Sequence, residues 1–430
     1  MTTKSTQMQI QLGRRYRQVR DLLAAEGPGA VAKRVRRSTA DWIAPKNIVM
    51  PVRHADVMHA DLSRPRKQVV ADIVAGKPLI VNWVTTPPSP GSGGHTTLFR
   101  MVRYLEEHGY QNRIYFYDVY GGDHSYYLSI VRDYFRFSGP VADVEDGMED
   151  ADAVMATCWP SAYPVFNSPC IGKRFYFVQD FEPLFHPTGA VSLLAENTYR
   201  MGFHAITAGR WLSQKLSKEF GMTADSFDFG CDVMSYSRAD KSKRNGVVFY
   251  ARPDAARRGF ELGLMAIEIF AARHPEIEIH FYGDKMGKLP FRFVDHGRVT
   301  PQQLNEIYNK CYAGLSLSLT NVSLVPHEML AAGCIPVVNE GLQNRMVLDN
   351  PFVCYAPAYP HALASELEAI VTDPSFEALS RSAAASVHGF TWDDAGATVD
   401  RILRCALQQE AYEPMQGCLA VSPGCGGSSN

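Results

Sequence analysis

The sequence lacks several features, and each absence excludes a class of protein. No apolar run approaches the length of a membrane span, and the first residues, MTTKSTQMQIQLGRR, contain no apolar segment like that of a signal peptide. Basic and acidic residues nearly balance, 43 against 45, which argues against a generally cationic nucleic-acid binder. We therefore expect a globular protein of the cytoplasm.

The sequence also lacks the motifs of a cysteine-based metal site and of a dinucleotide-binding site. The nine cysteines show no CxxC spacing and no nearby paired histidines, so we expect reduced core thiols, no disulfide framework and no metal site. The fingerprint GxGxxG, followed by an acidic residue at the end of the next strand, is missing from both halves. An NAD-linked oxidoreductase, which would share the same type of sheet, is therefore excluded.

What is present indicates an α/β protein of more than one domain. A chain of 430 residues with 46% hydrophobic content exceeds the usual size of a single core. Apolar strand patterns alternate with helical patterns, which is typical of doubly wound parallel sheets. We predict a first Rossmann-like domain over 78–236 and a second over 246–389, joined by the polar segment Ser237 to Asn245. Residues 390–410 are predicted to form a helix, and the Gly- and Ser-rich tail 411–430 is expected to be disordered.

Residues 1–77 form a basic N-terminal extension. The first seventy positions hold 14 Lys and Arg against 5 Asp and Glu, an excess of nine. Helical patterns are predicted near Gln9 to Ala25 and Gly29 to Ile43. One interpretation is a helical extension solvated on the surface of the first domain; the other is peripheral contact with an anionic membrane surface.

The segment from Gly246 to Gly341 contains the clearest candidate binding site. A predicted strand, Val247 to Tyr250, leads into a turn with Arg252 and Arg258 and then into a long helical pattern. Backbone N–H groups at a helix N-terminus and arginine side chains bind phosphate oxygens. Further on we predict a strand over 312–319, a helix over 324–332 and a strand over 335–338, which places Glu328 just past a strand end, where ligands bind in open α/β sheets.

The first domain offers candidate residues at two strand ends. Leu79 to Val84 are predicted to form the first strand, and a loop with Gly93 and Gly94 then leads to a helix from His95 to His108. His95 is either structural or a group that orients substrate or accepts a proton. Asp180 and Glu182 follow the strand 174–178. They either cap the next helix or bind and deprotonate an acceptor hydroxyl.

The segments ARPDAARRGFELG, SLTNVSLVPHEMLAAGCIPVV and QDFEPLFHPTG resemble those of GT-B glycosyltransferases of family 4, and most closely the bacterial rhamnosyltransferases of the WsaF type. The likeness extends from about Leu79 to Gln408. It implies the GT-B fold, in which two Rossmann-like domains face each other across a cleft and the final helix crosses back to the first domain.

The resemblance also implies roles for individual residues. Arg252 and Arg258 would clamp the donor diphosphate, and Glu328 would hold the nucleotide ribose. The family usually has a second glutamate eight residues before this one, and here that position is Thr320, so neutral hydrogen bonds would replace a carboxylate. The candidate donor-binding residues are Gly93, Gly94, Arg252, Arg258, Gly283, Thr320, Asn321, Ser323, Leu324 and Glu328. The candidate catalytic residues are His95, Asp180, Glu182, Arg252 and Arg258.

The sequence thus predicts a metal-independent glycosyltransferase with no cofactor. By the resemblance, the donor is dTDP-L-rhamnose, and the acceptor is a glycan or lipid-linked glycan in bacterial surface polysaccharide synthesis. Thr320 favours the alternative of a non-catalytic protein that binds a nucleotide sugar or polysaccharide. The retention of Arg252, Arg258 and Glu328 together argues against that alternative.

Overall fold

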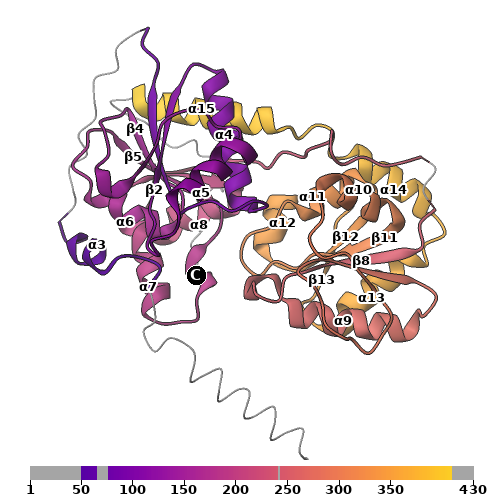
Figure 1. Ribbon diagram of the computed structural model, residues 1–430. Helices are drawn as coiled ribbons and strands as arrows, with labels where there is room; N and C mark the ends of the chain where they lie inside the picture. The colour runs from indigo at the N-terminus through magenta and orange to yellow at the C-terminus, as the bar shows by residue number, and fades with distance from the viewer. Residues whose placement is uncertain (1–49, 65–75, 241–242, 409–430) are drawn as a thin grey trace, which may run out of the picture. The chain divides into compact units, whose positions relative to one another are not determined.

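The computed structural model describes residues 50–64, 76–240 and 243–408 (Figure 1). The chain divides into two compact units, Met1–Pro51 and Val52–Asn430. All the helices and strands described below belong to the second unit. The predicted helices at 9–25 and 29–43 and the tail 411–430 lie outside the described residues. Within the described ranges, no helix is both long and apolar enough to cross a membrane.

The first lobe is built on a seven-stranded parallel sheet in the order β3-β2-β1-β4-β5-β6-β7. The strands are β1 Ile80–Thr85, β2 Gln111–Phe116, β3 Val141–Asp143, β4 Ala153–Ala156, β5 Lys173–Val178, β6 His204–Ala208 and β7 Ala224–Phe227. The inner strands β1, β4, β5 and β6 are almost wholly buried, as expected for a parallel sheet covered on both faces, whereas the edge strands β3 and β7 are mostly half-buried. The strand order reverses between β1 and β4, and this switch point is where such sheets bind ligands.

Helices connect these strands. They are α3 His54–His59, α4 Gly93–Glu107, α5 His124–Ser129, α6 Trp159–Asn167, α7 Ala190–Asn197 and α8 Arg210–Phe220, with short helical turns at 130–134, 144–146, 182–185 and 198–200. Trp83 on β1 illustrates the core: its ring meets Phe177 on β5 edge to face at 5.9 Å, and its indole N–H donates to Asn112 Oδ1 at 2.8 Å. The one polar atom of this buried ring is therefore satisfied.

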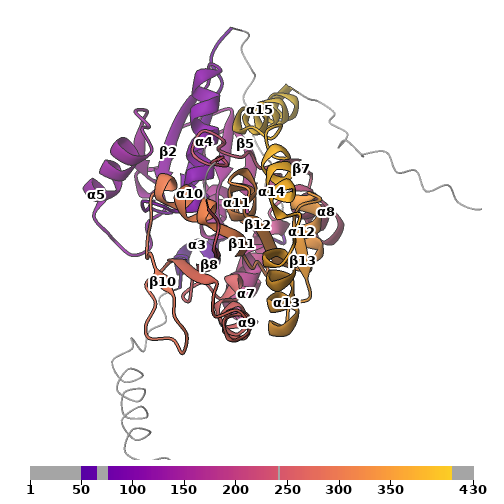
Figure 2. The same cartoon turned by 90° about the vertical axis from the view of Figure 1, so that its right-hand side faces the viewer.

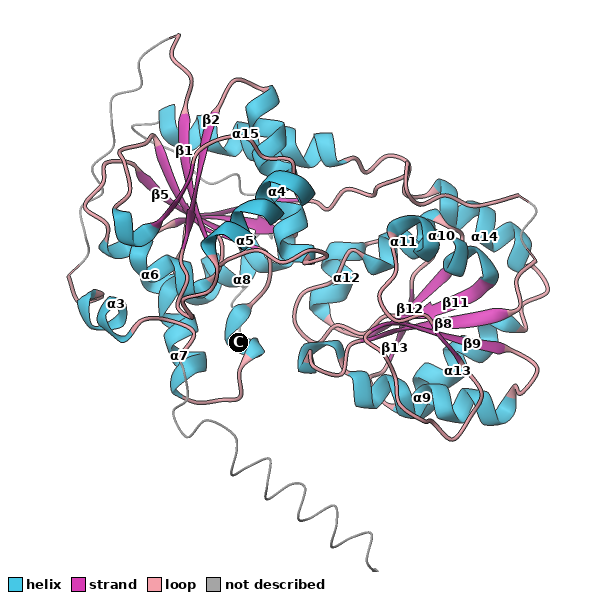
Figure 3. Cartoon of the chain, viewed as in Figure 1, coloured by secondary structure: helices cyan, strands magenta, loops and turns pink. Residues whose placement is uncertain are grey.

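The second lobe has a six-stranded parallel sheet in the order β10-β9-β8-β11-β12-β13. Its strands are β8 Gly246–Ala251, β9 Glu278–Gly283, β10 Val294–Asp295, β11 Cys311–Leu315, β12 Ile335–Asn339 and β13 Cys354–Ala356. Its helices are α9 Phe260–Arg273, α10 Pro301–Lys310, α11 Val325–Ala331, α12 Leu342–Leu348, α13 Pro360–Val371 and α14 Phe376–Ala385. Figure 3 shows α9 and α13 on one face of this sheet and α10, α11 and α14 on the other.

The last described helix, α15 Trp392–Gln408, packs on the first lobe although it follows the second in sequence. Figures 1 and 2 show it beside α4. Tyr110 donates to Asp400 Oδ1 at 2.6 Å, and Lys173 Nζ donates to the carbonyl of Ala406 at 2.6 Å. Gly396 lies against Tyr104 so closely that a Cβ would come within 2.2 Å of its ring. Glycine at position 396 is therefore required by the packing of the two helices.

Several element boundaries differ from the sequence prediction. The strand predicted over 312–319 ends at Leu315, because Ser318 N donates to Asn339 Oδ1 at 2.7 Å and Leu319 N donates to the carbonyl of Arg257 at 2.9 Å. The chain therefore leaves the sheet and forms a loop against the basic turn. The edge strand β10 has only two residues, and Phe293 before it packs on Phe281 with ring centroids 5.2 Å apart.

Two other segments also differ. Helix α4 begins at Gly93, two residues before the predicted start, because the Ser92 side chain caps it by accepting from His95 N. The segment predicted as a linker packs on the second lobe at its end. The guanidinium of Arg244 is 7% exposed and donates to the carbonyls of Tyr308, Cys311 and Ala332 at 2.6–2.8 Å.

Candidate functional site

Three arginines lie in the turn that connects β8 to α9. Arg252 follows the end of β8, and Arg257 and Arg258 belong to a short 3-10 turn that closes at Gly259. Gly259 adopts a left-handed φ of +56°, which allows α9 to begin at the next residue. The turn therefore places three cationic side chains beside the N-terminus of a helix of 14 residues.

The two predicted clamp arginines are held differently. Arg252 Nε lies 3.1 Å from Asp284 Oδ2 and Nη1 lies 3.2 Å from the Tyr250 hydroxyl, and its side chain stays 39% exposed. Arg258 Nη1 donates to Ser318 Oγ at 2.8 Å and to the carbonyl of Asn321 at 3.4 Å. Burial lowers the pKa of Arg258, the positive charges of Arg257 and Arg252 add to that effect, and Asp180 opposes it. The structure thus brings both arginines into one electrostatic group.

Asp180, at the end of β5, connects the two lobes. Its Oδ1 accepts from the backbone N–H of Phe181 and of Asn321, both at 2.8 Å, and its Oδ2 accepts from Thr320 Oγ1 at 3.0 Å. Arg257 Nε lies 3.7 Å from the same Oδ2. Burial raises the pKa of this carboxyl, while Arg258 and Arg257 lower it. Asp180 is therefore a carboxylate engaged with the second lobe and not a free base in this structure.

Asn321 extends this connection to the glycine-rich segment of the first lobe. Its side-chain amide donates to the carbonyls of Gln179 and Ala208 at 2.9 and 3.0 Å, and Gln179 Nε2 donates to the carbonyl of Gly94 at 3.1 Å. Five of the predicted residues, Gly94, Asp180, Arg258, Thr320 and Asn321, are thus joined directly or through one shared neighbour. A Cβ on Gly93 would meet no atom within 4 Å, so the described residues leave open space there.

Some polar atoms in this region are buried without a partner. Arg257 Nε, Asn321 Oδ1 and Ser323 Oγ have no hydrogen-bond partner among the described residues. A buried polar atom without a partner is costly, so each such group in a native protein needs an explanation, of which a bound ligand is one. These three atoms come from the basic turn and from the loop after β11, the two segments expected to hold a donor.

Glu328 lies on α11, within the electrostatic range of residues from three other segments. Burial raises its pKa to about 7, Arg100 on α4 and the Tyr308 hydroxyl on α10 lower it, and Asp232 raises it further. Arg100 itself lies 3.5 Å from Asp232 and stacks over the ring of Trp392 at 4.4 Å. The carboxyl group of Glu328 is thus desolvated and close to titration near neutral pH. Leu324 supplies the carbonyl that accepts from Glu328 N at 3.2 Å.

Gly283 and His95 have structural reasons for their identity. Gly283 has φ of +115°, and a Cβ there would come within 2.4 Å of the Ala251 carbonyl. His95 Nε2 lies 3.0 Å from the carbonyl of Thr86, and Nδ1 lies 2.8 Å from Ser92 Oγ. Burial lowers the pKa of His95. Its neutral imidazole therefore fixes the loop between β1 and α4.

The carboxyl group of Glu182 is buried among groups of the first lobe. Its Oε2 accepts from the backbone N–H of Trp159 and from the Tyr176 hydroxyl, which lies 3.0 Å away. Burial raises its pKa to about 8, and the charge of Asp180 adds to that increase. The carboxyl group is therefore engaged inside the first lobe, between β4, β5 and α6. Its proposed contact with an acceptor hydroxyl has no support in this arrangement.

Two arginines of this region are not among the residues predicted from the sequence. Arg257 is adjacent to Arg258, and this run of arginines before a helix is the signal that could have identified it. Arg100 lies on α4 and meets Asp232 and Glu328 only through the fold, so no local pattern identified it. Among the described residues, no group of three or more His, Cys, Asp and Glu side chains could hold a metal ion.

Part of the sequence is similar to known proteins. Residues 245–368 match the family described as "WsaF, C-terminal domain". The O-antigen biosynthesis protein RfbC of Myxococcus xanthus is 33% identical over 274 residues. The match covers 61% of this chain and only 21% of that protein.

Solved structures with the same fold are distant in sequence. HepE of Anabaena, in complex with UDP-glucose, is 13% identical with a TM-score of 0.60, covering 76% of this chain and 99% of HepE. The pneumococcal O-GlcNAc transferase GtfA, in complex with UDP and GlcNAc, is 9% identical with a TM-score of 0.60, covering 77% of this chain and 99% of GtfA. The predicted resemblance and fold class are therefore confirmed: residues 245–368 are similar to the C-terminal domain of WsaF, and the chain has the GT-B fold.

Proposed function

We propose that this protein is a glycosyltransferase that moves a sugar from a nucleotide diphosphate donor to a glycan or lipid-linked glycan in bacterial surface polysaccharide synthesis. The observation that carries the proposal is the convergence of Arg252, Arg257 and Arg258 at the N-terminus of α9. The three cations meet two nearby carboxylates, Asp180 and Asp284, which leaves one positive charge in excess for a diphosphate. The WsaF match over 245–368 includes the whole of this turn.

The proposed chemistry is electrostatic stabilisation of the leaving group. As the glycosidic bond to the donor breaks, negative charge grows on the diphosphate. Arg258, already fixed by Ser318 and Asn321, would donate to it without reorganising, and the first N–H groups of α9 would add to the same field. Arg257 has a buried Nε that lies 3.7 Å from Asp180 but has no hydrogen-bond partner among the described residues, and it would take a phosphate oxygen.

The rest of the donor would be held by the loop after β11 and by α11. Glu328, when ionised, would accept from the ribose hydroxyls. Thr320, Asn321 and Ser323 would bind hydroxyls of the donor sugar, with the unpartnered Asn321 Oδ1 and Ser323 Oγ as the available atoms. Gly93 and Gly94 would allow close approach of the donor from the first lobe.

In this proposal, residues of the first lobe hold the loops around the donor in place. Asp180 would hold the Thr320–Asn321 loop against the first lobe, and His95 would fix the loop between β1 and α4. Glu182 is left out, because its carboxyl group is engaged with Trp159 and Tyr176. The basic extension 1–77, expected to contact the inner face of a membrane from the cytoplasmic side, lies largely outside the described residues and stays a proposal.

For the donor we propose dTDP-L-rhamnose, on the strength of the likeness to WsaF-type enzymes. The solved complexes of HepE and GtfA contain UDP-glucose and UDP, so UDP sugars are the main competing donors. A thermal-shift screen of the full chain with dTDP, UDP and GDP, and with their sugars, distinguishes these donors. A ligand at one hundred times its Kd adds about 2.7 kcal/mol to the free energy of unfolding.

We expect dTDP-L-rhamnose to give the largest increase in Tm and Arg258→Ala to remove it. An increase with UDP or GDP compounds alone would reject the rhamnose assignment. An increase with none of them would reject donor binding altogether.

Thr320 supports one alternative, a non-catalytic protein that binds a nucleotide sugar. Here a neutral hydroxyl, itself bound to Asp180, stands where the family usually has a carboxylate. Hydrolysis of the donor in the absence of acceptor separates the two proposals. A transferase is expected to release dTDP slowly, whereas a binding protein would shift in Tm with the donor and release none.

A further inference from the structure

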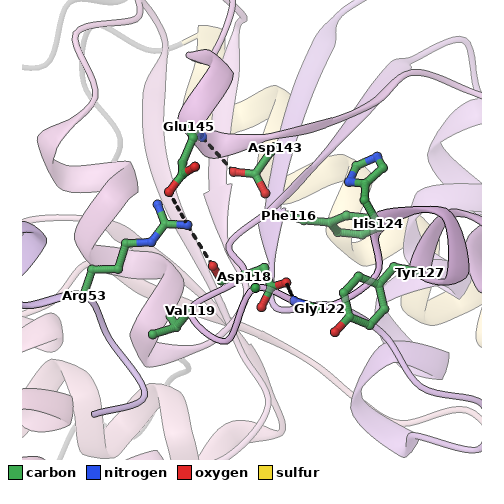
Figure 4. Close-up of a pocket in the computed structure, with 10 residues that line it drawn as sticks. Arg53, Phe116, Asp118, Val119, Gly122, His124, Tyr127, Asp143 and Glu145 are labelled. Atoms are coloured by element: carbon green, nitrogen blue, oxygen red, sulfur yellow. Dashed lines mark hydrogen bonds and ion pairs between the residues drawn. The ribbon is translucent and has the colours of Figure 1, made fainter. Parts of the chain in front are cut away.

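A cavity of about 310 Å³ lies at the carboxyl ends of β2 and β3, and none of the predicted site residues lines it (Figure 4). We propose that this cavity binds a neutral sugar unit of the acceptor glycan, an inference that rests on the transferase proposal. Its volume is at the lower end of the range for small-molecule pockets, about 300–1,000 Å³, which suits a sugar rather than a long lipid chain.

One wall of the cavity is aromatic. Phe116, the last residue of β2, is 1% exposed and meets His124 at 5.6 Å and Tyr127 at 6.1 Å, both edge to face. Asp123 caps α5 by accepting from the N–H groups of Ser125 and Tyr126, so the helix that carries both rings has a fixed start. The rings of His124 and Tyr127 are therefore held in place by packing on the buried Phe116, and the surface that the cavity exposes is more polar than apolar, which suits the hydroxyl groups of a sugar.

Three polar groups around the cavity have no hydrogen-bond partner among the described residues. They are the ring nitrogens of His124, the hydroxyl of Tyr127 and one carboxylate oxygen of Asp143. The other oxygen of Asp143 accepts from Glu145 N at 2.8 Å, which fixes the orientation of the carboxylate. Figure 4 shows His124 and Tyr127 extending from α5 on the side of the cavity opposite Arg53. These donors and acceptors are suited to sugar hydroxyls.

The charge of the lining selects against anionic ligands. Arg53 is already engaged, with Nη2 lying 2.9 Å from Glu145 Oε1 and donating to the Asp118 carbonyl at 2.8 Å. The carboxylates of Asp118, Asp143 and Glu145 therefore outnumber the one arginine. A phosphate or a uronate would meet like charge here, which is destabilising. A neutral sugar would not.

The position of the cavity connects it to the proposed transfer site. Strand β2 pairs with β1, and the loop after β1 leads to the first turn of α4, which holds Gly93, Gly94 and His95 at the same edge of the sheet. Neighbouring strands are about 4.8 Å apart, so the cavity lies on the order of one or two sugar rings from that loop. This spacing fits a unit of the acceptor near the one that carries the reacting hydroxyl.

The test measures sugar binding to the full chain without donor. Saturation-transfer NMR would use methyl α-L-rhamnoside and methyl α-D-mannoside as neutral probes and methyl α-D-glucuronide as the anionic probe. The test variants are Tyr127→Phe and Asp143→Asn, each of which removes one interacting group while keeping the shape of the side chain. The matched controls are Tyr126→Phe and Asp146→Asn, at positions that do not line the cavity.

We expect at least one neutral probe to bind more tightly than the glucuronide, and the combined test variants to weaken it about tenfold, because two hydrogen bonds are lost. The controls should bind as the unaltered chain does. Unchanged binding in the combined variants, tighter binding of the glucuronide, or binding of no neutral probe would overturn the inference. Hydrolysis of dTDP-L-rhamnose without acceptor, which the combined variants should retain, reports separately on the transferase proposal.

Discussion

If the proposed diphosphate clamp exists, substitution of Arg258 should lower the rate of transfer strongly. In Arg258→Ala, the guanidinium that donates to Ser318 Oγ and to the Asn321 carbonyl is lost together with its charge. A charge-assisted hydrogen bond contributes about 1.5–3 kcal/mol, so one lost bond to the leaving diphosphate lowers the rate by about one to two orders of magnitude. Two lost bonds would nearly abolish turnover.

The effect should appear in kcat/KM for the donor, measured by release of the nucleotide diphosphate. Arg258→Lys keeps a charge but loses the planar fork, so we expect an intermediate rate. Arg292→Ala is the matched control, since Arg292 is exposed in the same lobe and makes no ion pair with the described residues. Circular dichroism would show whether each variant is folded.

A folded Arg258→Ala variant with the kcat/KM of the control would refute the clamp. Loss of binding without loss of kcat at saturating donor would also contradict the argument, because transition-state stabilisation must appear in kcat.

Two further predictions concern other buried groups. Because the pKa of Glu328 is about 7, we expect the affinity for dTDP of the unaltered chain, divided by that of Glu328→Gln and measured by calorimetry, to increase from about pH 6 to about pH 8 as the carboxyl ionises. The ratio cancels the ionisation of the terminal phosphate of dTDP itself, which also occurs at about pH 6. A ratio that does not change with pH would contradict this assignment. The same raised pKa means that the contribution of Glu328 to the free energy of unfolding falls as the pH rises from about 4.5, the ordinary pKa of a glutamate, to about 7. In Arg244→Met, three buried carbonyls lose their donor, at a cost of about 3 kcal/mol or more, so Tm should fall by about 10 °C. An unchanged Tm would show that other groups satisfy these carbonyls.

Much of the fold could be predicted from the sequence, because the local patterns of apolar and turn-forming residues agree with it. The strands predicted over 247–250 and 335–338 are both present, as β8 and β12, because each is a short apolar run rich in β-branched residues. The segment LSLSL was misread, because its apolar alternation continues past Leu315 while the hydrogen bonds of Ser318 and Leu319 go elsewhere. Those partners lie far away in sequence.

The sequence identified individual residues of the candidate site but not the contacts between them. Arg252, Arg258 and Glu328 were found from their family segments, but the bond between Asp180 and Asn321 joins residues 141 positions apart. No local pattern reports such a contact. Asp180 and Glu182 are two residues apart and looked alike in sequence, yet one reaches the second lobe and the other is held inside the first by Trp159.

The position of α15 affects how the chain acquires its structure during synthesis. The second lobe is complete once residue 389 has left the ribosome, whereas the first lobe still lacks the helix that covers Tyr104 and Tyr110. The first lobe, although it is synthesised first, is therefore completed after the second lobe. Nascent chains released before residue 392 should expose an apolar strip on α4 and recruit chaperones, even though every strand of both sheets has already been translated.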